Sequence, residues 1–284
     1  MRILILGVSG MLGNAMFKIL SQSSSHEIYG TARSSSVLHH FSDVLQKKIS
    51  IGIDVENTDS LIRLFDSLKP EIVINCIGLI KQLEVSDDPL ITLPINSIFP
   101  HRLANLCKLI KSKVIHISTD CVFSGKKGFY NEQDQPDASD LYGRSKLLGE
   151  LYYSHAITIR TSIIGHEINT KNGLIEWFLS QDKNVSGYTK AIFSGLPTFE
   201  LGRVIRDYIL PKEELCGLYH VSSMPISKYD LLNLVNHEYK KNIKINPSDD
   251  FVIDRSLDSS YFQEITGYSP PTWKTLISQM RSFN

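Results

Sequence analysis

The sequence predicts an α/β protein in which a doubly wound parallel sheet carries a smaller C-terminal α/β lobe. Short aliphatic runs alternate with helical patterns through the first half of the chain, as expected for parallel strands joined by crossover helices. The runs at 3–6 and 72–75 are almost wholly apolar, which suits strands covered on both faces. A glycine-rich turn follows the first run directly.

The elements follow from this alternation in chain order. Strands are expected at 3–6, 27–32, 49–53, 72–75, 114–118 and 156–160, and helices at 11–20, 61–68, 103–110, 141–152 and 229–239, the last with Ser227 as its N-cap. Beyond Thr161 the rhythm becomes irregular. We therefore expect one domain at 1–160, with 217–222 returning to its sheet, and a second lobe formed by 161–216 and 223–284.

Composition excludes several classes of function. Thirty basic and thirty acidic residues cancel, which argues against a nucleic-acid or anionic-membrane surface. The sequence shows neither a signal peptide nor a membrane span, so a cytoplasmic protein is expected. The four cysteines form no CxxC pair and the nine histidines no HExxH motif, so we expect reduced thiols and no metal site.

The glycine-rich turn predicts a dinucleotide site in a Rossmann-type fold. Its spacing is GxxGxxG: Gly7 allows a tight turn, Gly10 lets a pyrophosphate approach the backbone, and Gly13 lets the helix pack on the sheet. The helix N-terminus would then face the phosphates with free N–H groups. The expected contacts are Gly7, Ser9, Gly10, Met11 and Leu12.

The end of the second strand indicates which dinucleotide is bound. An acidic residue that would bind an adenosine ribose is absent, and Arg33 can pair with a 2′-phosphate, unless it is simply a solvated loop arginine. This favours NADP(H), with NAD(H) as the alternative. Asp54 and Val55, after the third strand, are placed to touch the adenine.

Tyr142 and Lys146 are candidate catalytic residues because they lie four positions apart, on one face of the expected helix. A nearby ammonium lowers the pKa of a phenol, which can still give its proton to a developing alkoxide. Such a pair is common by chance, but here Thr119 precedes it at a strand end where ligands bind in such folds. A hydroxyl there can hold a carbonyl beside Tyr142.

The order of glycine turn, strand-end hydroxyl and Tyr-x-x-x-Lys resembles the short-chain dehydrogenase/reductase superfamily. Within it, STDCVFSG and YGRSKLLGE resemble segments of the dTDP-4-dehydrorhamnose reductase family, as SLDSSYF and TGYSPPTW do more loosely. The resemblance implies NADPH-dependent reduction of a keto group on a nucleotide-activated deoxysugar, and a homodimer. It also implies a catalytic Thr119, Tyr142 and Lys146, and cofactor contacts from Cys76, Ile77, Gly78 and Asn96, any of which could instead be a turn or cap residue.

The substrate is expected over the second lobe, because the sugar must reach both the nicotinamide and Tyr142. Tyr188 and Lys190 offer an aromatic face and a cation, and Arg255 a planar fork suited to a diphosphate, although each charge could be an ordinary surface residue. The full set of expected substrate contacts is Thr119, Asp120, Cys121, Thr161, Ser162, Tyr188, Lys190 and Arg255.

Three alternatives remain to be weighed. Related nucleotide-sugar dehydratases carry Thr-Asp-Glu where this chain has Thr119-Asp120-Cys121, so dehydration is disfavoured. Cys121 and His166 resemble the proton-exchanging pair of the epimerase-reductase GDP-fucose synthase, although a buried Cys and a surface His are the simpler interpretation. The chain also resembles the regulatory subunit of methionine adenosyltransferase, a non-catalytic NADP-binding relative.

Overall fold

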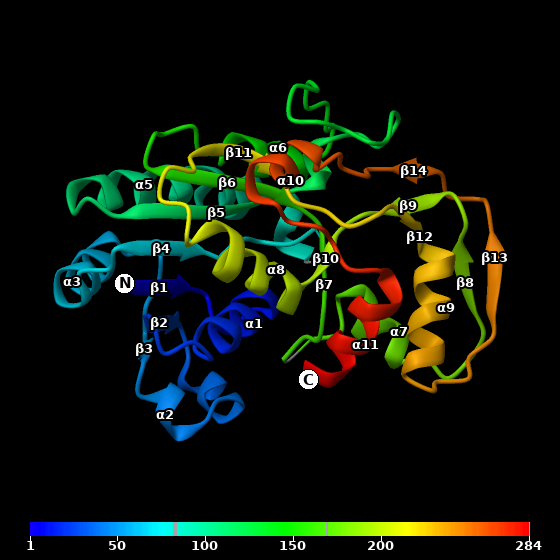
Figure 1. Ribbon diagram of the computed structural model, residues 1–284, viewed down its shortest axis with the longest axis horizontal. Coiled ribbons are helices and arrows are strands. Elements are labelled where there is room, and N and C mark those ends of the chain that lie inside the picture. The colour runs from blue at the N-terminus through cyan, green and yellow to red at the C-terminus, as the bar shows by residue number, and fades with distance from the viewer. Residues whose placement is uncertain (82–83, 169, 284) are drawn as a thin grey trace.

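The central sheet is built on apolar strands that alternate their side chains between two covered faces. The computed structural model describes residues 1–81, 84–168 and 170–283, and in these ranges the sheet has seven strands in the order β11-β6-β5-β4-β1-β2-β3 (Figure 1). Every neighbouring pair is parallel. The strands are β1 (Arg2–Leu6), β2 (Glu27–Ala32), β3 (Ile49–Ile51), β4 (Ile72–Asn75), β5 (Lys113–Thr119), β6 (Ala156–Thr161) and β11 (Gly217–His220).

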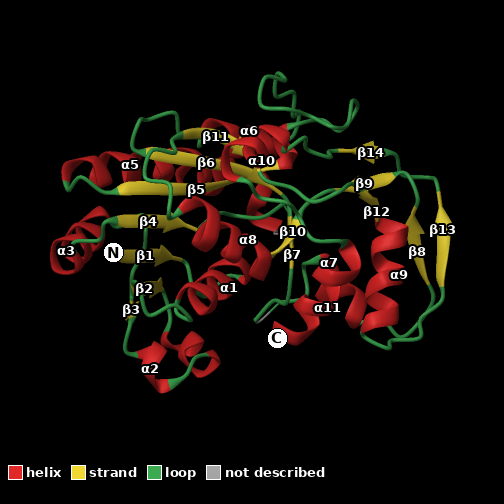
Figure 2. Cartoon of the chain, viewed as in Figure 1, coloured by secondary structure: helices red, strands yellow, loops and turns green. Residues whose placement is uncertain are grey.

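Helices cover both faces of this sheet (Figure 2). Leu4 and Leu6 of β1 point to the face covered by α3 and α5, whereas Ile3 and Ile5 point to the face covered by α1 and α8. The helical segments of this half are α1 (Met11–Leu20), η1 (Ser35–His40), α2 (Asp43–Gln46), α3 (Thr58–Leu68), η2 (Glu84–Asp87), α4 (Pro89–Leu93), η3 (Pro94–Ile98), α5 (Phe99–Leu109), η4 (Asp120–Val122) and α6 (Leu141–Leu148).

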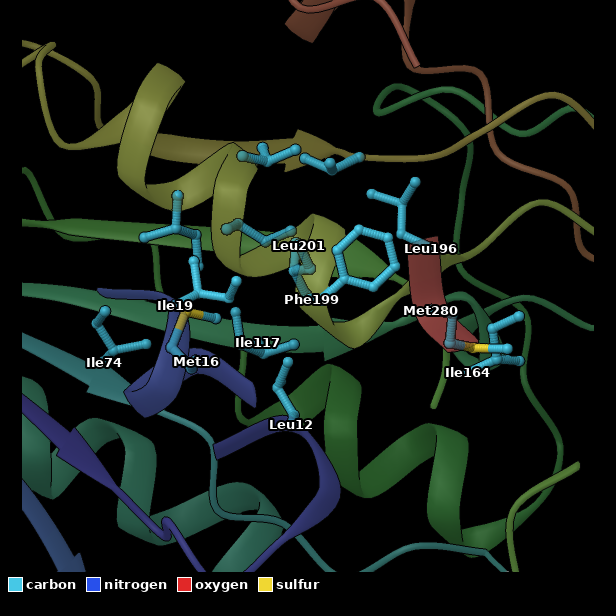
Figure 3. Close-up of a cluster of buried hydrophobic side chains, with 14 of the residues drawn as sticks. Leu12, Met16, Ile19, Ile74, Ile117, Ile164, Leu196, Phe199, Leu201 and Met280 are labelled. Atoms are coloured by element: carbon cyan, nitrogen blue, oxygen red, sulfur yellow. The ribbon is translucent and has the colours of Figure 1, made fainter. Parts of the chain in front are cut away.

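The first helix joins the two halves of the molecule through a buried apolar cluster. Leu12, Met16 and Ile19 of α1 lie with Phe199 and Leu201 of α8 in Figure 3, and all five are buried. The two helices approach closely, since a Cβ atom on Gly202 would lie 3.2 Å from Ile19. Met280 of α11 lies beside Ile164 and Leu196 in the same view. The second lobe is thus packed onto the glycine-turn helix.

The chain after β6 forms small sheets and helices, most of which lie beside the central sheet, while α8 and α10 lie over it (Figure 1). Its sheets are β10-β7, β12-β9-β14 and β13-β8. Their strands are β7 (Ile163–Ile164), β8 (Val185–Tyr188), β9 (Ala191–Phe193), β10 (Leu196–Pro197), β12 (Ile226–Ser227), β13 (Ile245–Ser248) and β14 (Ile253–Asp254). The helices are α7 (Leu174–Leu179), α8 (Thr198–Val204), η5 (Ile205–Ile209), α9 (Lys228–Glu238), α10 (Ser260–Thr266) and α11 (Trp273–Phe283).

The predicted fold class is confirmed, and the differences are local. The helix that carries Tyr142 ends at Leu148 rather than at residue 152. The residue after it, Gly149, is the C-cap and lies so close to the helix η3 that a Cβ atom would lie 2.0 Å from the Asn96 carbonyl oxygen. Ser227 caps α9 as expected, its hydroxyl accepting from the Asp230 N–H at 3.0 Å.

Within the ranges that the structure describes, no helix is long and apolar enough to cross a membrane.

Candidate active site

The glycine turn forms an uncapped helix N-terminus. Gly7 adopts a φ of 88°, which favours glycine, and a Cβ atom on Gly13 would lie 2.1 Å from the Gly7 carbonyl oxygen. Gly10 occupies the N-cap of α1 without a side-chain hydrogen bond, so the amides of the first turn have no side-chain partner. A diphosphate placed there would accept hydrogen bonds from these amides and meet the positive end of the helix dipole. The turn therefore fits a dinucleotide.

The residues expected near the adenosine lie beside this turn. Val8 N–H donates to the Thr31 carbonyl at 3.0 Å, which brings the turn against the end of β2. Arg33 follows that strand, is exposed, and has no hydrogen-bond or ion-pair partner among the described residues. Asp54 is also exposed, and its Oδ1 accepts from the Glu56 N–H at 3.0 Å. Val55 is half-buried against the core.

The turn after β4 brings the next group of expected cofactor residues together. Asn96 Oδ1 accepts from the Leu79 N–H at 2.9 Å. A Cβ atom on Gly78 would lie 3.4 Å from that same oxygen and 3.6 Å from Lys146 Nζ. Ile77 contacts the glycine turn, since a Cβ atom on Gly7 would lie 2.7 Å from Ile77 Cγ1. A continuous surface thus runs from the glycine turn to Lys146.

The predicted Thr119–Tyr142 pair is close in space. Thr119 is the last residue of β5, its Oγ1 accepts from the Cys121 N–H at 3.1 Å, and its side chain lies close enough to the Tyr142 hydroxyl to lower the pKa of that phenol slightly. The helix α6 lies against this strand end, because a Cβ atom on Gly143 would lie 2.3 Å from the Cys121 carbonyl oxygen. Its N-cap is Asp140, which accepts from the Gly143 N–H at 2.8 Å. Two hydroxyl groups therefore face one point at the carboxyl end of β5.

Burial shifts the titration of both side chains of the helix pair. Lys146 is 5% exposed, and its Nζ donates to the Ile117 carbonyl at 2.7 Å. Burial lowers the pKa of Lys146 to about 8, because a cation loses its hydration there. Burial raises the pKa of Tyr142 above its ordinary value, with the nearby Cys121 as a smaller cause. Near neutral pH, Tyr142 is therefore a phenol and Lys146 remains mostly charged.

The strand-end turn gathers most of the expected substrate residues. Asp120 is buried and hydrogen-bonded to Ser162, and burial raises its pKa. Arg255 donates from Nε to the Phe123 carbonyl at 2.8 Å, and its Nη1 lies 3.6 Å from Cys121 Sγ. Arg255 thus lies against the turn that follows Thr119. Thr161 pairs with Thr119 across the sheet but is 2% exposed, so it contributes backbone rather than a free hydroxyl.

The two thiols beside the site, Cys76 and Cys121, are held in the neutral form near pH 7. Burial raises the pKa of Cys121 to about 12, and that of Cys76 to about 12. All four cysteines are free.

Among the described residues, no hydrogen bond, ion pair or ring contact joins Tyr188 or Lys190 to Thr119 or Tyr142. The Tyr188 ring packs edge-on against Phe251 with centroids 5.5 Å apart, and the Lys190 ammonium pairs with Asp249 at 3.1 Å. Sequence reasoning missed Lys228 instead. This lysine starts α9 and lies within electrostatic range of Asp120 and Arg255. Nothing in the sequence around a lysine that follows an N-cap serine predicts that it lies near Asp120 and Arg255.

His166 is engaged in a separate cluster. Its Nδ1 lies 2.5 Å from Glu176 Oε1 and its Nε2 lies 2.8 Å from the Tyr239 hydroxyl. It also lines a cavity of about 210 Å³ together with Met11 and other residues of α1, α8 and α11. Within the described ranges, no three His, Cys, Asp or Glu side chains cluster to hold a metal ion.

The fold and the site together define a Rossmann-type protein of the extended short-chain dehydrogenase/reductase superfamily. The uncapped glycine turn and the Tyr142–Lys146 helix lie at one edge of the parallel sheet, as that class requires. The chain belongs to the family described as RmlD substrate binding domain, whose model matches residues 1–282.

Curated relatives agree with this family. A dTDP-4-dehydrorhamnose reductase from Aggregatibacter actinomycetemcomitans is 24% identical, and the match covers 99% of both chains. A probable low-salt glycan biosynthesis reductase, Agl14, from Haloferax volcanii is 31% identical over 51% of this chain and 46% of its own length. Methionine adenosyltransferase 2 subunit beta from Rattus norvegicus is 27% identical over 52% of this chain and 41% of its own length. The chain thus spans under half the length of the last two.

Solved structures share the fold over the whole chain. A hypothetical dTDP-4-dehydrorhamnose reductase from Sulfolobus tokodaii has a TM-score of 0.80 at 26% identity, covering 96% of this chain and 98% of its own. A dTDP-4-dehydrorhamnose reductase from Bacillus anthracis in complex with NADP also has a TM-score of 0.80, at 22% identity, covering 99% and 98% of the two chains.

Proposed function

We propose that this protein is an NADPH-dependent reductase of a keto group on a nucleotide-activated deoxysugar. The observation that carries the proposal is the convergence of Thr119, Tyr142 and Lys146 at the carboxyl end of β5, next to an uncapped glycine turn. The full-length match to a dTDP-4-dehydrorhamnose reductase supports the substrate class.

The residues divide the chemistry between them. Bound NADPH supplies the hydride for the carbonyl carbon. Thr119 and Tyr142 hold the carbonyl oxygen by hydrogen bonds, and the Tyr142 hydroxyl gives its proton to that oxygen as the alcohol forms. The Lys146 cation stabilises the phenolate left on Tyr142 until solvent returns a proton, and it also holds the nicotinamide ribose. The reaction consumes one hydride and one proton for each keto group.

The other expected residues bind rather than react. Gly7, Ser9, Gly10, Met11 and Leu12 hold the diphosphate of the cofactor, Arg33 its 2′-phosphate, Asp54 and Val55 its adenine, and Cys76, Ile77, Gly78 and Asn96 line the path to the nicotinamide. Asp120, Cys121, Ser162 and Arg255 hold the sugar. We place the enzyme in the cytoplasm, where its free thiols stay reduced, as a homodimer with 1–160 and 217–222 binding the cofactor and the remainder binding the substrate.

A panel of 4-keto nucleotide sugars, including dTDP-4-dehydrorhamnose, tests this proposal. We expect NADPH oxidation with at least one member, with deuterium from labelled NADPH appearing at the new carbinol carbon. If NADPH binds but no member of the panel is reduced, the proposal is wrong and a binding role like that of the regulatory relative is favoured. If deuterium from solvent also enters at C3 or C5, the epimerase-reductase alternative is favoured.

A further inference from the structure

A buried ion pair lies directly behind the catalytic face. Glu150 and Arg160 are each 2% exposed, and the guanidinium binds both carboxylate oxygens, Nε to Oε1 at 2.8 Å and Nη2 to Oε2 at 2.7 Å. Ser118 Oγ donates to the same Oε1 at 2.7 Å. A carboxylate with this many donors is held in one position.

Glu150 and Lys146 form hydrogen bonds with consecutive residues of β5. Lys146 Nζ donates to the Ile117 carbonyl, while Glu150 accepts from Ser118, the next residue along. The residue after Ser118 is Thr119, whose hydroxyl faces Tyr142. The short helix α6 and the turn after it therefore fix the strand end at two adjacent points.

Glu150 is also the negative charge that faces the buried Lys146. The other titratable groups near that ammonium are Cys76 from the β4 turn and His116 from β5, and Tyr142 precedes Lys146 by four residues on α6. Burial raises the pKa of Cys76 to about 12 and that of Tyr142 above its usual value, so both are neutral near pH 7. Burial holds the pKa of His116 well below its usual value, so it is neutral as well. The Glu150 carboxylate alone among these four groups opposes the Lys146 charge.

We infer that Glu150 is a positioning residue of this site, whose carboxylate, held by Arg160 and Ser118, keeps Lys146 charged and fixes the strand end that carries Thr119. The inference rests on the proposed reductase function for its catalytic meaning. The charge relation itself does not depend on that function, because burial disfavours any ammonium that lacks an opposing charge.

The test measures the titration of Lys146 directly. The full chain is labelled with ¹³C-lysine, its Lys146 signal is assigned from a Lys146→Arg variant, and the signal is followed against pH. Removing Glu150 alone would strand a buried guanidinium, so the informative variant is Glu150→Gln with Arg160→Gln, which neutralises both partners. Its folding is verified by thermal melting and NADPH binding. We expect Lys146 to lose its proton at lower pH than in the unmodified protein.

Activity supplies the second readout. With the double variant, the alkaline fall in kcat should move to lower pH, with about a fivefold loss at pH 8 for a displacement of one pH unit and little change in KM for the sugar. Ser118→Ala, which keeps the charge pair, is the matched control and should leave the Lys146 titration in place.

A second variant keeps the inference testable if the double variant does not fold. Glu150→Asp keeps a carboxylate beside Arg160 but withdraws it by one methylene, and should shift Lys146 in the same direction by less. If the pH at which Lys146 titrates is unchanged in the double variant or in Glu150→Asp, whichever folds, the inference is overturned. If the unmodified protein reduces no sugar, the proposed function fails, but the NMR titration still decides the role of Glu150.

Discussion

The ammonium group of Lys146 donates a 2.7 Å hydrogen bond to the carbonyl oxygen of Ile117, two residues before the end of β5. This contact ties the helix of Tyr142 to the strand of Thr119, as the Glu150–Ser118 hydrogen bond does one residue further along, and so helps to hold the proton donor relative to the second hydroxyl. The same cation titrates close to physiological pH, because burial lowers its pKa to about 8.

The pH dependence of reduction follows from this titration. Lys146 is charged below its pKa, so the rate of keto reduction should be steady below pH 8 and fall as the pH rises through that value. Tyr142 does not set this limit, since burial raises its pKa above the ordinary value and keeps the phenol protonated. Single-turnover reduction measured from pH 6 to 10 tests this. A rate that continues to rise above pH 9 would contradict the assigned role of Lys146.

Tyr142→Phe removes the proton donor and keeps the ring. Hydride transfer should slow by roughly 10²–10⁴-fold, while NADPH affinity stays nearly unchanged. Stopped-flow single turnover and a separate NADPH titration distinguish these effects. Normal single-turnover reduction in the variant would show that another group donates the proton.

Arg33→Ala tests the cofactor preference. Arg33 is exposed beside the glycine turn, so its guanidinium is free to meet a 2′-phosphate. The variant should bind NADPH more weakly by about 1–3 kcal/mol, the contribution of a charge-assisted contact, and bind NADH as before. Calorimetric titration with both cofactors provides the comparison. Equal affinity for NADPH and NADH in the unmodified protein would rule out the preference.

Arg255 and Lys190 form a matched pair of cations for locating the substrate. Arg255 lies against Cys121 at the strand end, whereas Lys190 is mostly exposed and pairs with Asp249. Arg255→Ala should raise KM for the nucleotide sugar about 10- to 100-fold without changing NADPH affinity. Lys190→Ala should leave KM near its original value. Steady-state kinetics on both variants decide this, and a larger effect at Lys190 would move the sugar nucleotide over β8 and β9.

The local features of the cofactor half were readable from the sequence for physical reasons. Strands buried on both faces must be continuously apolar, and a phosphate turn needs glycines at fixed spacing, so α1, β2 and β4 were predicted with their observed bounds and β1 to within one residue. Thr119 ends the strand β5, and Tyr142 lies near the start of the helix α6. Both could be expected at the same edge of the sheet, because parallel strands share their carboxyl ends.

The tertiary structure decided which distant groups meet. Arg255 and Cys121 are 134 residues apart, and Lys228 reaches the same turn from the start of α9, so no local periodicity could place them. The pairing of Glu150 with Arg160 is likewise invisible in the sequence, since each residue alone looks like an ordinary surface charge. The sequence by itself determined the backbone pattern and the chemistry of single residues. The packing of β6 against β5, and of the later part of the chain on α1, decided which side chains pair with each other. Burial there removes the water that would otherwise separate the paired charges.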